Sequence, residues 1–212
     1  MRRTPALPAG THIGDRLSSY SLDPILSLRR SQTMKSRSDY SEFEMVNVDF
    51  ALETANAAIR WAVDTFGADL CLLSSMQDAL LIDLAVKCDP GFDVVFLANA
   101  FHFPETLATR AQTEHHYGIS VRTLGPDPAA NLDLAAEECC DAKVAVLDQA
   151  LRGNRAWFSR IRRDETGARA TAELVGTDRR GLSKINPLAG WTAADAISYI
   201  ELRNVPTHPL LD

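Results

Sequence analysis

Two hydrophobic patterns take turns along the chain from residue 48 onward. Stretches with apolar residues at helical spacing predict helices, and short uninterrupted apolar runs predict strands. Pro104 suits the first turn of a helix, Gly118 its end, and Thr192 the cap of the last one. The predicted helices cover 48–67, 77–88, 104–117, 141–153 and 193–204. The predicted strands cover 69–74, 93–98, 119–124, 156–161, 172–176 and 182–187.

The alternation of strand and helix between residues 69 and 124 predicts the fold class. Such spacing favours a parallel sheet with right-handed connections and helices on its faces, a three-layer α/β fold. Ligands of these sheets bind beyond the carboxyl ends of the strands. The loops at 74–78, 98–106 and 162–166 would meet at that edge. One edge would then form one pocket.

Composition narrows the class of protein. The 212 residues carry 22 Lys and Arg against 28 Asp and Glu, and this net charge of -6 argues against a general nucleic-acid binder. No apolar run is long enough for a membrane span, and none resembles a secretory signal. Four cysteines do not indicate a disulfide scaffold in a chain this long, so we expect a cytoplasmic protein.

The first 45 residues differ from the rest of the chain. They are rich in Ser, Pro and Arg and lack sustained hydrophobic periodicity. We therefore expect a flexible N-terminal extension over 1–45, followed by one folded domain over 46–212.

Candidate binding residues lie in the three loops at the predicted sheet edge. In "SSMQD", Ser74, Ser75 and Asp78 precede a helix start, where backbone N–H groups can hold an anion. The alternative is that one of these serines only caps the helix. In the second loop, His102 is either a binding residue or a packed ring before a helix.

The third loop, within "SRIRRDET", supplies Arg162 and Arg163. Guanidinium groups match the paired oxygens of phosphate and sulfate and stay charged at any relevant pH. Alternatively, Asp164 and Glu165 simply pair with these arginines as a surface charge cluster. We favour the binding role because the loop follows a predicted buried strand.

The motifs "FHFPET", "ECCDAK", "RRDE" and "INPLAGWT" resemble those of the assimilatory sulfonucleotide reductases, the adenylyl-sulfate and phosphoadenylyl-sulfate reductase family. The resemblance runs from about Leu70 to Asp212. It implies an adenine-nucleotide α-hydrolase-like fold and reduction of adenylyl sulfate or phosphoadenylyl sulfate to sulfite and a nucleotide. It also implies thioredoxin or glutathione as reductant, places Lys184 near the substrate, and allows a homo-oligomer.

The adjacent Cys139 and Cys140 resemble half of the cluster site of the adenylyl-sulfate branch. In that branch, the pair and a later Cys-x-x-Cys hold a 4Fe-4S cluster, in which adjacent cysteines can bind different irons. The family's second pair and its catalytic cysteine would lie beyond Asp212, so no catalytic residue is assigned within the chain. We expect either a truncated chain or a divergent member.

Several departures from the family pattern support an alternative. Ser75, Ala100 and Arg160 stand where the family has glycine, and Ala98 replaces an aspartate. Arg160 would narrow the pocket or add a phosphate contact. These changes favour a non-catalytic nucleotide-binding relative on the same fold. A pyrophosphatase-type enzyme that uses ATP is disfavoured, because "SSMQD" lacks the glycine-rich turn that pyrophosphate needs.

Overall fold

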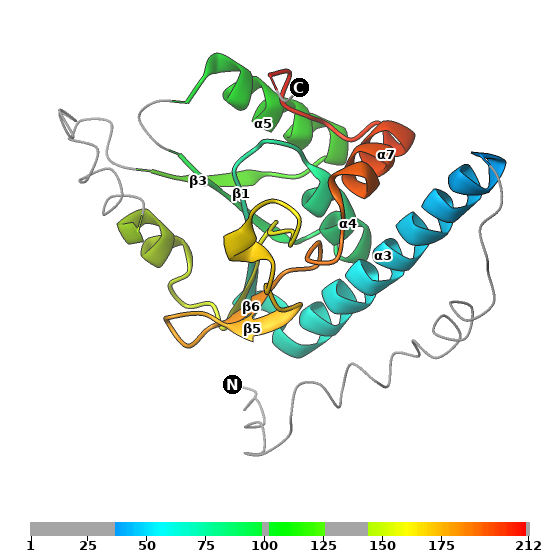
Figure 1. The fold of residues 1–212 in the computed structure, drawn as a ribbon. Helices are drawn as coiled ribbons and strands as arrows, with labels where there is room; N and C mark the ends of the chain where they lie inside the picture. The colour runs from blue at the N-terminus through cyan, green and yellow to red at the C-terminus, as the bar shows by residue number, and fades with distance from the viewer. Residues whose placement is uncertain (1–36, 99–101, 126–143, 211–212) are drawn as a thin grey trace, which may run out of the picture.

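The computed structural model describes residues 37–98, 102–125 and 144–210, and for residues 37–49 it describes the backbone alone. Strands and helices alternate along most of this length (Figure 1). The helices are α3 (Arg37–Phe66), α4 (Leu80–Cys88), α5 (Pro104–Tyr117) and α7 (Ala193–Arg203), and residues 144–150 are also helical. The strands are β1 (Leu70–Ser74), β2 (Asp93–Leu97), β3 (Val121–Leu124), β4 (Ala156–Phe158), β5 (Val175–Thr177) and β6 (Ser183–Ile185). Short 3-10 helices cover Gly67–Asp69 and Gly167–Arg169.

The strands form one six-stranded sheet in the order β3-β2-β1-β4-β6-β5. All neighbours are parallel except β5 and β6. The turn between those two strands spans Asp178 to Gly181, which has φ +78°, and so short a connection can join only antiparallel strands. The predicted α/β fold is therefore confirmed, with one antiparallel strand at the edge of a mostly parallel sheet.

Side chains that alternate along the strands face two different apolar layers. Leu72, Val94 and Phe158 belong to the larger core, in which α3, α4 and α7 pack on one face of the sheet. Cys71 and Trp157 belong to a smaller core on the other face, which also holds Ala150 from the helical residues 144–150. This arrangement is the predicted three-layer architecture, because period-two alternation gives each strand two buried faces.

Several element boundaries depart from the prediction: α4 and β5 each begin three residues later than predicted, and two other departures bear on the site. Helix α3 begins at Arg37, well before the predicted start at residue 48. Between these two positions the sequence has no proline or glycine that would interrupt a helix. Residues 1–36 lie outside the described part, so the extension over 1–45 stays a prediction. Strand β4 ends at Phe158 instead of residue 161, and the chain then turns into the loop that carries Arg160.

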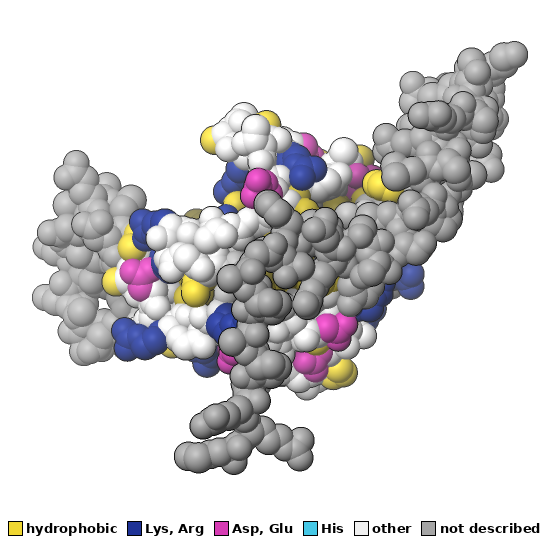
Figure 2. All heavy atoms as spheres, turned by 90° about the horizontal axis from the view of Figure 1, so that it is seen from below, with side chains coloured by type: hydrophobic (Ala, Val, Ile, Leu, Met, Phe, Trp, Pro, Cys, Tyr) yellow, Lys and Arg dark blue, Asp and Glu magenta, His cyan; other side chains and the backbone are white. Residues whose placement is uncertain are grey.

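The described surface mixes charges of both signs. In the face shown in Figure 2, Lys and Arg side chains lie among Asp and Glu side chains and do not merge into one basic surface. Within the described ranges, none of the helices has the length and apolar character that crossing a membrane requires.

A capping box fixes the start of α7. The Thr192 hydroxyl accepts a hydrogen bond from the Asp195 amide at 3.1 Å, and the Asp195 carboxylate accepts one from the Thr192 amide at 2.8 Å. At the other end Asn204 adopts the left-handed conformation with φ +50°. Both ends of α7 are therefore set by local sequence.

We predict that Thr192→Ala lowers the free energy of unfolding by about 1 kcal/mol, because the Asp195 amide in the first turn of α7 loses its side-chain acceptor. Urea denaturation measures the change. Ser198→Ala is the matched control, since it removes an exposed hydroxyl from the same helix. Equal losses in both variants, or none in Thr192→Ala, would contradict the assignment of the cap.

Candidate functional site

The loop after β1 is built around a buried carboxylate. Ser74 ends the strand, and its hydroxyl accepts a hydrogen bond from the amide of Met76, which has φ +57°. Asp78 is 4% exposed, and its Oδ1 accepts a hydrogen bond from the Leu80 amide at 3.0 Å. Thus Asp78 caps the first turn of α4, whereas Ser74 stabilises the turn before it. Ser75 is exposed at the tip of this loop.

Arg160 connects this loop to the loop after β4. Its Nε donates to Asp78 Oδ1 at 3.2 Å and its Nη2 donates to Asp78 Oδ2. Its Nη1 donates to Gln77 Oε1 at 2.9 Å and lies 3.6 Å from Glu165 Oε1. Arg160 was expected either to narrow the pocket or to add a phosphate contact. A phosphate contact would require the guanidinium to exchange some of these partners.

Arg162 lies in the same charge network. Its Nε donates to Asp164 Oδ1 at 3.0 Å, its Nη1 is 3.7 Å from Glu165 Oε1, and its side chain is 12% exposed. Arg169 also pairs with Glu165. The sequence allowed Asp164 and Glu165 to pair with the neighbouring arginines, and this pairing is present at Arg162. Glu165 forms ion pairs with three guanidinium groups, those of Arg160, Arg162 and Arg169.

Arg163 is exposed and points its Nε toward a different segment. That atom donates to the Ala172 carbonyl at 2.7 Å, and the Arg163 amide donates to the Ala189 carbonyl at 3.1 Å. The backbone bond ties this loop to the "INPLAGWT" segment that follows β6. Arg162 and Arg163 thus lie at the same sheet edge but have different partners.

His102 packs at the carboxyl end of β2. Its Nε2 is 3.3 Å from the Leu97 carbonyl oxygen, and its ring centroid is 4.7 Å from that of Phe96. This is the packed-ring arrangement that was one of the two readings of the residue. It nevertheless holds His102 at the predicted edge, just before the start of α5 at Pro104.

Lys184 lies on β6, opposite Trp157 of β4. Its Nζ is 5.0 Å from the centre of the Trp157 ring. Burial lowers the pKa of Lys184, and the nearby Arg169 guanidinium lowers it further. Lys184 therefore adjoins the charge network through Arg169.

Residues 205–208 close one side of the β1–α4 loop. The Ala79 amide donates to the Pro206 carbonyl at 2.8 Å, and the His208 amide donates to the Gln77 carbonyl at 2.8 Å. The His208 ring Nε2 is 3.0 Å from the Thr106 hydroxyl of α5. The segment after α7 thus joins the loops that follow β1 and β2.

The two cysteines in the described residues do not make a cluster site. Cys71 is buried in β1, and burial raises the pKa of its thiol to about 12. Cys88 is exposed at the end of α4. No group of three or more His, Cys, Asp or Glu side chains in the described ranges could hold a metal ion. Cys139 and Cys140, like Asn99 and Ala100, lie outside those ranges.

The sequence did not indicate that Glu165 pairs with three arginines, or that Gln77 and His208 join the loops around the site. A local signal existed for Glu165, because Arg162 and Arg169 stand three and four residues from it. The contacts of Gln77 and His208 join distant segments and left no such signal. The predicted site residues in the first and third loops are brought together by Arg160, whereas His102 and Lys184 lie at its margins.

We predict that Arg160→Gln lowers the free energy of unfolding by about 2 kcal/mol, because it leaves the buried Asp78 carboxylate without its cation. Asp78→Asn in the same chain should recover part of the loss. A double-mutant cycle by urea denaturation measures the coupling, which we expect to exceed about 1 kcal/mol. Additive effects of the two substitutions would contradict the pairing.

Known proteins resemble this chain in sequence and in fold. Residues 70–212 match the phosphoadenosine phosphosulfate reductase domain. The adenosine 5'-phosphosulfate reductase of Streptomyces coelicolor is 41% identical over 170 residues, which cover 74% of this chain and 72% of that protein.

Two solved structures share the fold. The phosphoadenylyl-sulfate reductase of Candida auris, in a phosphate complex, superposes with a TM-score of 0.65 at 22% identity, covering 86% of this chain and 94% of that one. The FMN adenylyltransferase of Candida glabrata gives 0.62 at 16% identity, covering 92% and 64%. The architecture is thus adenine-nucleotide α-hydrolase-like, as predicted. Together with the match over residues 70–212, these similarities show that the chain belongs to the phosphoadenosine phosphosulfate reductase domain family.

Proposed function

We propose that this chain acts in sulfate assimilation by reducing adenylyl sulfate, or its 3′-phosphorylated form, to sulfite and a nucleotide. The observation that carries the proposal is the 41% identity to the Streptomyces coelicolor reductase over 170 residues. Thioredoxin or glutathione as reductant, a cytoplasmic location and self-association remain parts of the proposal that rest on the family resemblance.

The charges at the sheet edge support binding of a phosphosulfate group. We assign Arg162 and Arg163 to the phosphate and sulfate oxygens, because both follow β4 at the carboxyl edge of the parallel sheet. Asp164 and Glu165 already hold Arg162 in place, so the guanidinium loses little conformational entropy on binding. Ser74, Ser75 and the amides of their loop would meet the nucleotide phosphate, while His102 and Lys184 border the site.

Asp78 acts indirectly in this proposal. Its carboxylate is buried under Arg160 and the start of α4, so it shapes the loop that carries Ser74 and Ser75. Substrate binding by Asp78 itself would require Arg160 to move away. The proposal therefore treats Asp78 as a residue that positions the loop.

One observation favours the alternative of a non-catalytic nucleotide-binding relative. Arg160 stands at a position where the family has glycine, and its guanidinium spans the gap between the loops after β1 and β4. The two functions differ in turnover. Release of sulfite from adenylyl sulfate by the native protein with thioredoxin or glutathione supports the reductase, whereas nucleotide binding without sulfite supports the alternative.

We predict that isothermal titration calorimetry detects adenylyl sulfate binding, and that Arg162→Gln weakens it about tenfold, the loss expected for one charge-assisted contact. Arg162→Lys should fall between the two, because it keeps the charge but not the bidentate geometry. The matched control is Arg179→Gln, an exposed arginine in the β5–β6 turn. Equal affinity in Arg162→Gln and wild type would contradict the assigned role, and no heat with wild type would contradict nucleotide binding.

Cys139 and Cys140 are proposed as two of the four thiolate ligands of a 4Fe-4S cluster, whose other two ligands would come from the second cysteine pair that the family resemblance implies. We predict that the native protein, purified without oxygen, is brown and contains iron and sulfide, and that Cys139→Ser with Cys140→Ser removes both. Cys88→Ser is the control that should keep them, since Cys88 lies alone at the end of α4. A colourless native protein, or unchanged iron in the double variant, would contradict the assignment.

A further inference from the structure

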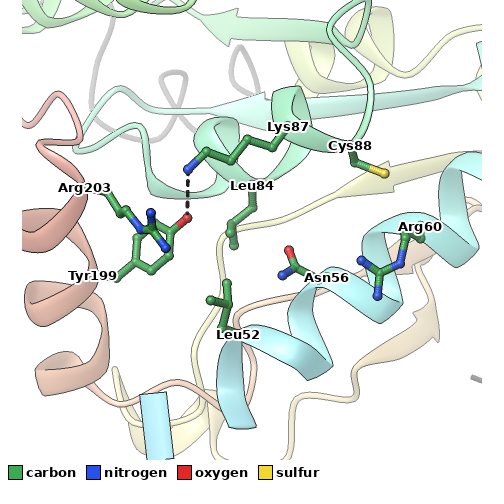
Figure 3. Close-up of a pocket in the computed structure, with 8 residues that line it drawn as sticks. All are labelled: Leu52, Asn56, Arg60, Leu84, Lys87, Cys88, Tyr199 and Arg203. Atoms are coloured by element: carbon green, nitrogen blue, oxygen red, sulfur yellow. Dashed lines mark hydrogen bonds between the residues drawn. The ribbon is translucent and has the colours of Figure 1, made fainter. Parts of the chain in front are cut away.

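Helices α3, α4 and α7 surround a pocket of about 450 Å³ on the sheet face that they cover (Figure 3). Every residue that lines it belongs to one of these helices, and none belongs to the residues assigned to the sulfonucleotide. This volume lies in the range that holds small organic ligands. The lining residues are Leu52, Asn56, Arg60, Leu84, Lys87, Cys88, Tyr199 and Arg203.

The lining carries three cations and no carboxylate. Arg60, Lys87 and Arg203 come from three different helices. The fold therefore brings them together, since they do not form a charged run in the sequence. The positive lining favours an anionic ligand.

Three acidic groups, Asp83, Asp64 and Asp89, lie behind and beside the pocket, and Asp83 pairs with Lys87. The buried Asp83 carboxylate accepts hydrogen bonds from Lys87 Nζ at 2.7 Å and from the Tyr199 hydroxyl at 2.6 Å. Burial raises the pKa of the Cys88 thiol, and of the nearby charges Arg60 lowers it while Asp64 and Asp89 raise it. Because Asp83 fixes Lys87 and Tyr199, that end of the pocket is already ordered before any ligand arrives.

The middle of the pocket is apolar. Figure 3 shows Leu52 and Leu84 between the end with Lys87, Tyr199 and Arg203 and the end with Arg60. Leu52 and Arg60 point to the same side because they are two helical turns apart on α3. A bare ion would contact the cations but would leave these leucines without a partner.

We propose that this pocket binds a small organic anion that combines an apolar body with a carboxylate or phosphate group. The apolar body lies between Leu52 and Leu84, and the anionic group contacts Lys87 and Arg203 at the ordered end of the pocket. The proposal concerns a second site, separate from the edge where the sulfonucleotide is expected, and it does not depend on the proposed activity.

Phenyl phosphate is a suitable probe because it has one dianionic group and one ring. Titration of isotope-labelled protein, followed by NMR, measures weak binding residue by residue. We expect saturable shifts at the amides of Leu84, Lys87 and Arg203, with smaller or no saturation for phenol and for inorganic phosphate. Equal binding of inorganic phosphate and phenyl phosphate would overturn the apolar part of the proposal, and no binding of phenyl phosphate would overturn the whole.

Substitutions distinguish this pocket from the sheet edge. Arg203→Gln should weaken phenyl phosphate binding about tenfold, whereas Arg60→Gln at the other end should weaken it less, and Arg179→Gln and Arg162→Gln should leave it unchanged. Arg203→Lys should restore part of the affinity, which a merely misfolded variant would not do. If Arg162→Gln weakens binding and Arg203→Gln does not, phenyl phosphate occupies the sulfonucleotide edge and the proposal is wrong.

Discussion

The buried carboxylate of Asp78 needs hydrogen-bond donors and a cation beside it, and the residues that supply them hold the loops of the candidate site together. An unpaired carboxylate at 4% exposure would be strongly destabilising, so the Leu80 amide and the Arg160 guanidinium must stay near it. Arg160 belongs to the loop after β4 and Leu80 to α4. Satisfying one charge therefore fixes two loops that meet at the carboxyl edge of the sheet.

A second buried carboxylate, Asp83 on α4, anchors α7. Asp83 accepts hydrogen bonds from Tyr199 and Lys87, and burial followed by this contact raises the pKa of the Tyr199 hydroxyl. Tyr199 consequently remains a neutral donor at physiological pH. Helix α7 in turn leads into residues 205–208, which bond to the loop around Asp78. One short stretch, from Asp78 to Asp83, thus couples the sheet edge to the outer helices.

Local patterns in the sequence were enough for the elements and for a parallel sheet with helices on its faces, but not for the order of its strands. Thr192 and Gly118 marked helix ends because capping depends on residues a few positions apart. The Arg160–Asp78 pair joins residues 82 positions apart, and nothing local to either residue indicates it. The pocket lined by Arg60, Lys87 and Arg203 was missed for the same reason, since each cation alone reads as an ordinary surface residue of a helix.

The sharing of Glu165 has a consequence for any anion that arrives at the sheet edge. Arg160, Arg162 and Arg169 all lie within ion-pair distance of this one carboxylate, which is 15% exposed. An anion that draws Arg162 away leaves Glu165 to bind the other two guanidinium groups more tightly, which strengthens the hold of the network on Arg160 and hence on Asp78. Effects of substitutions within this set should therefore not add. Arg160 thus makes the loop after β1 and the loop that carries Arg162 parts of one electrostatic unit.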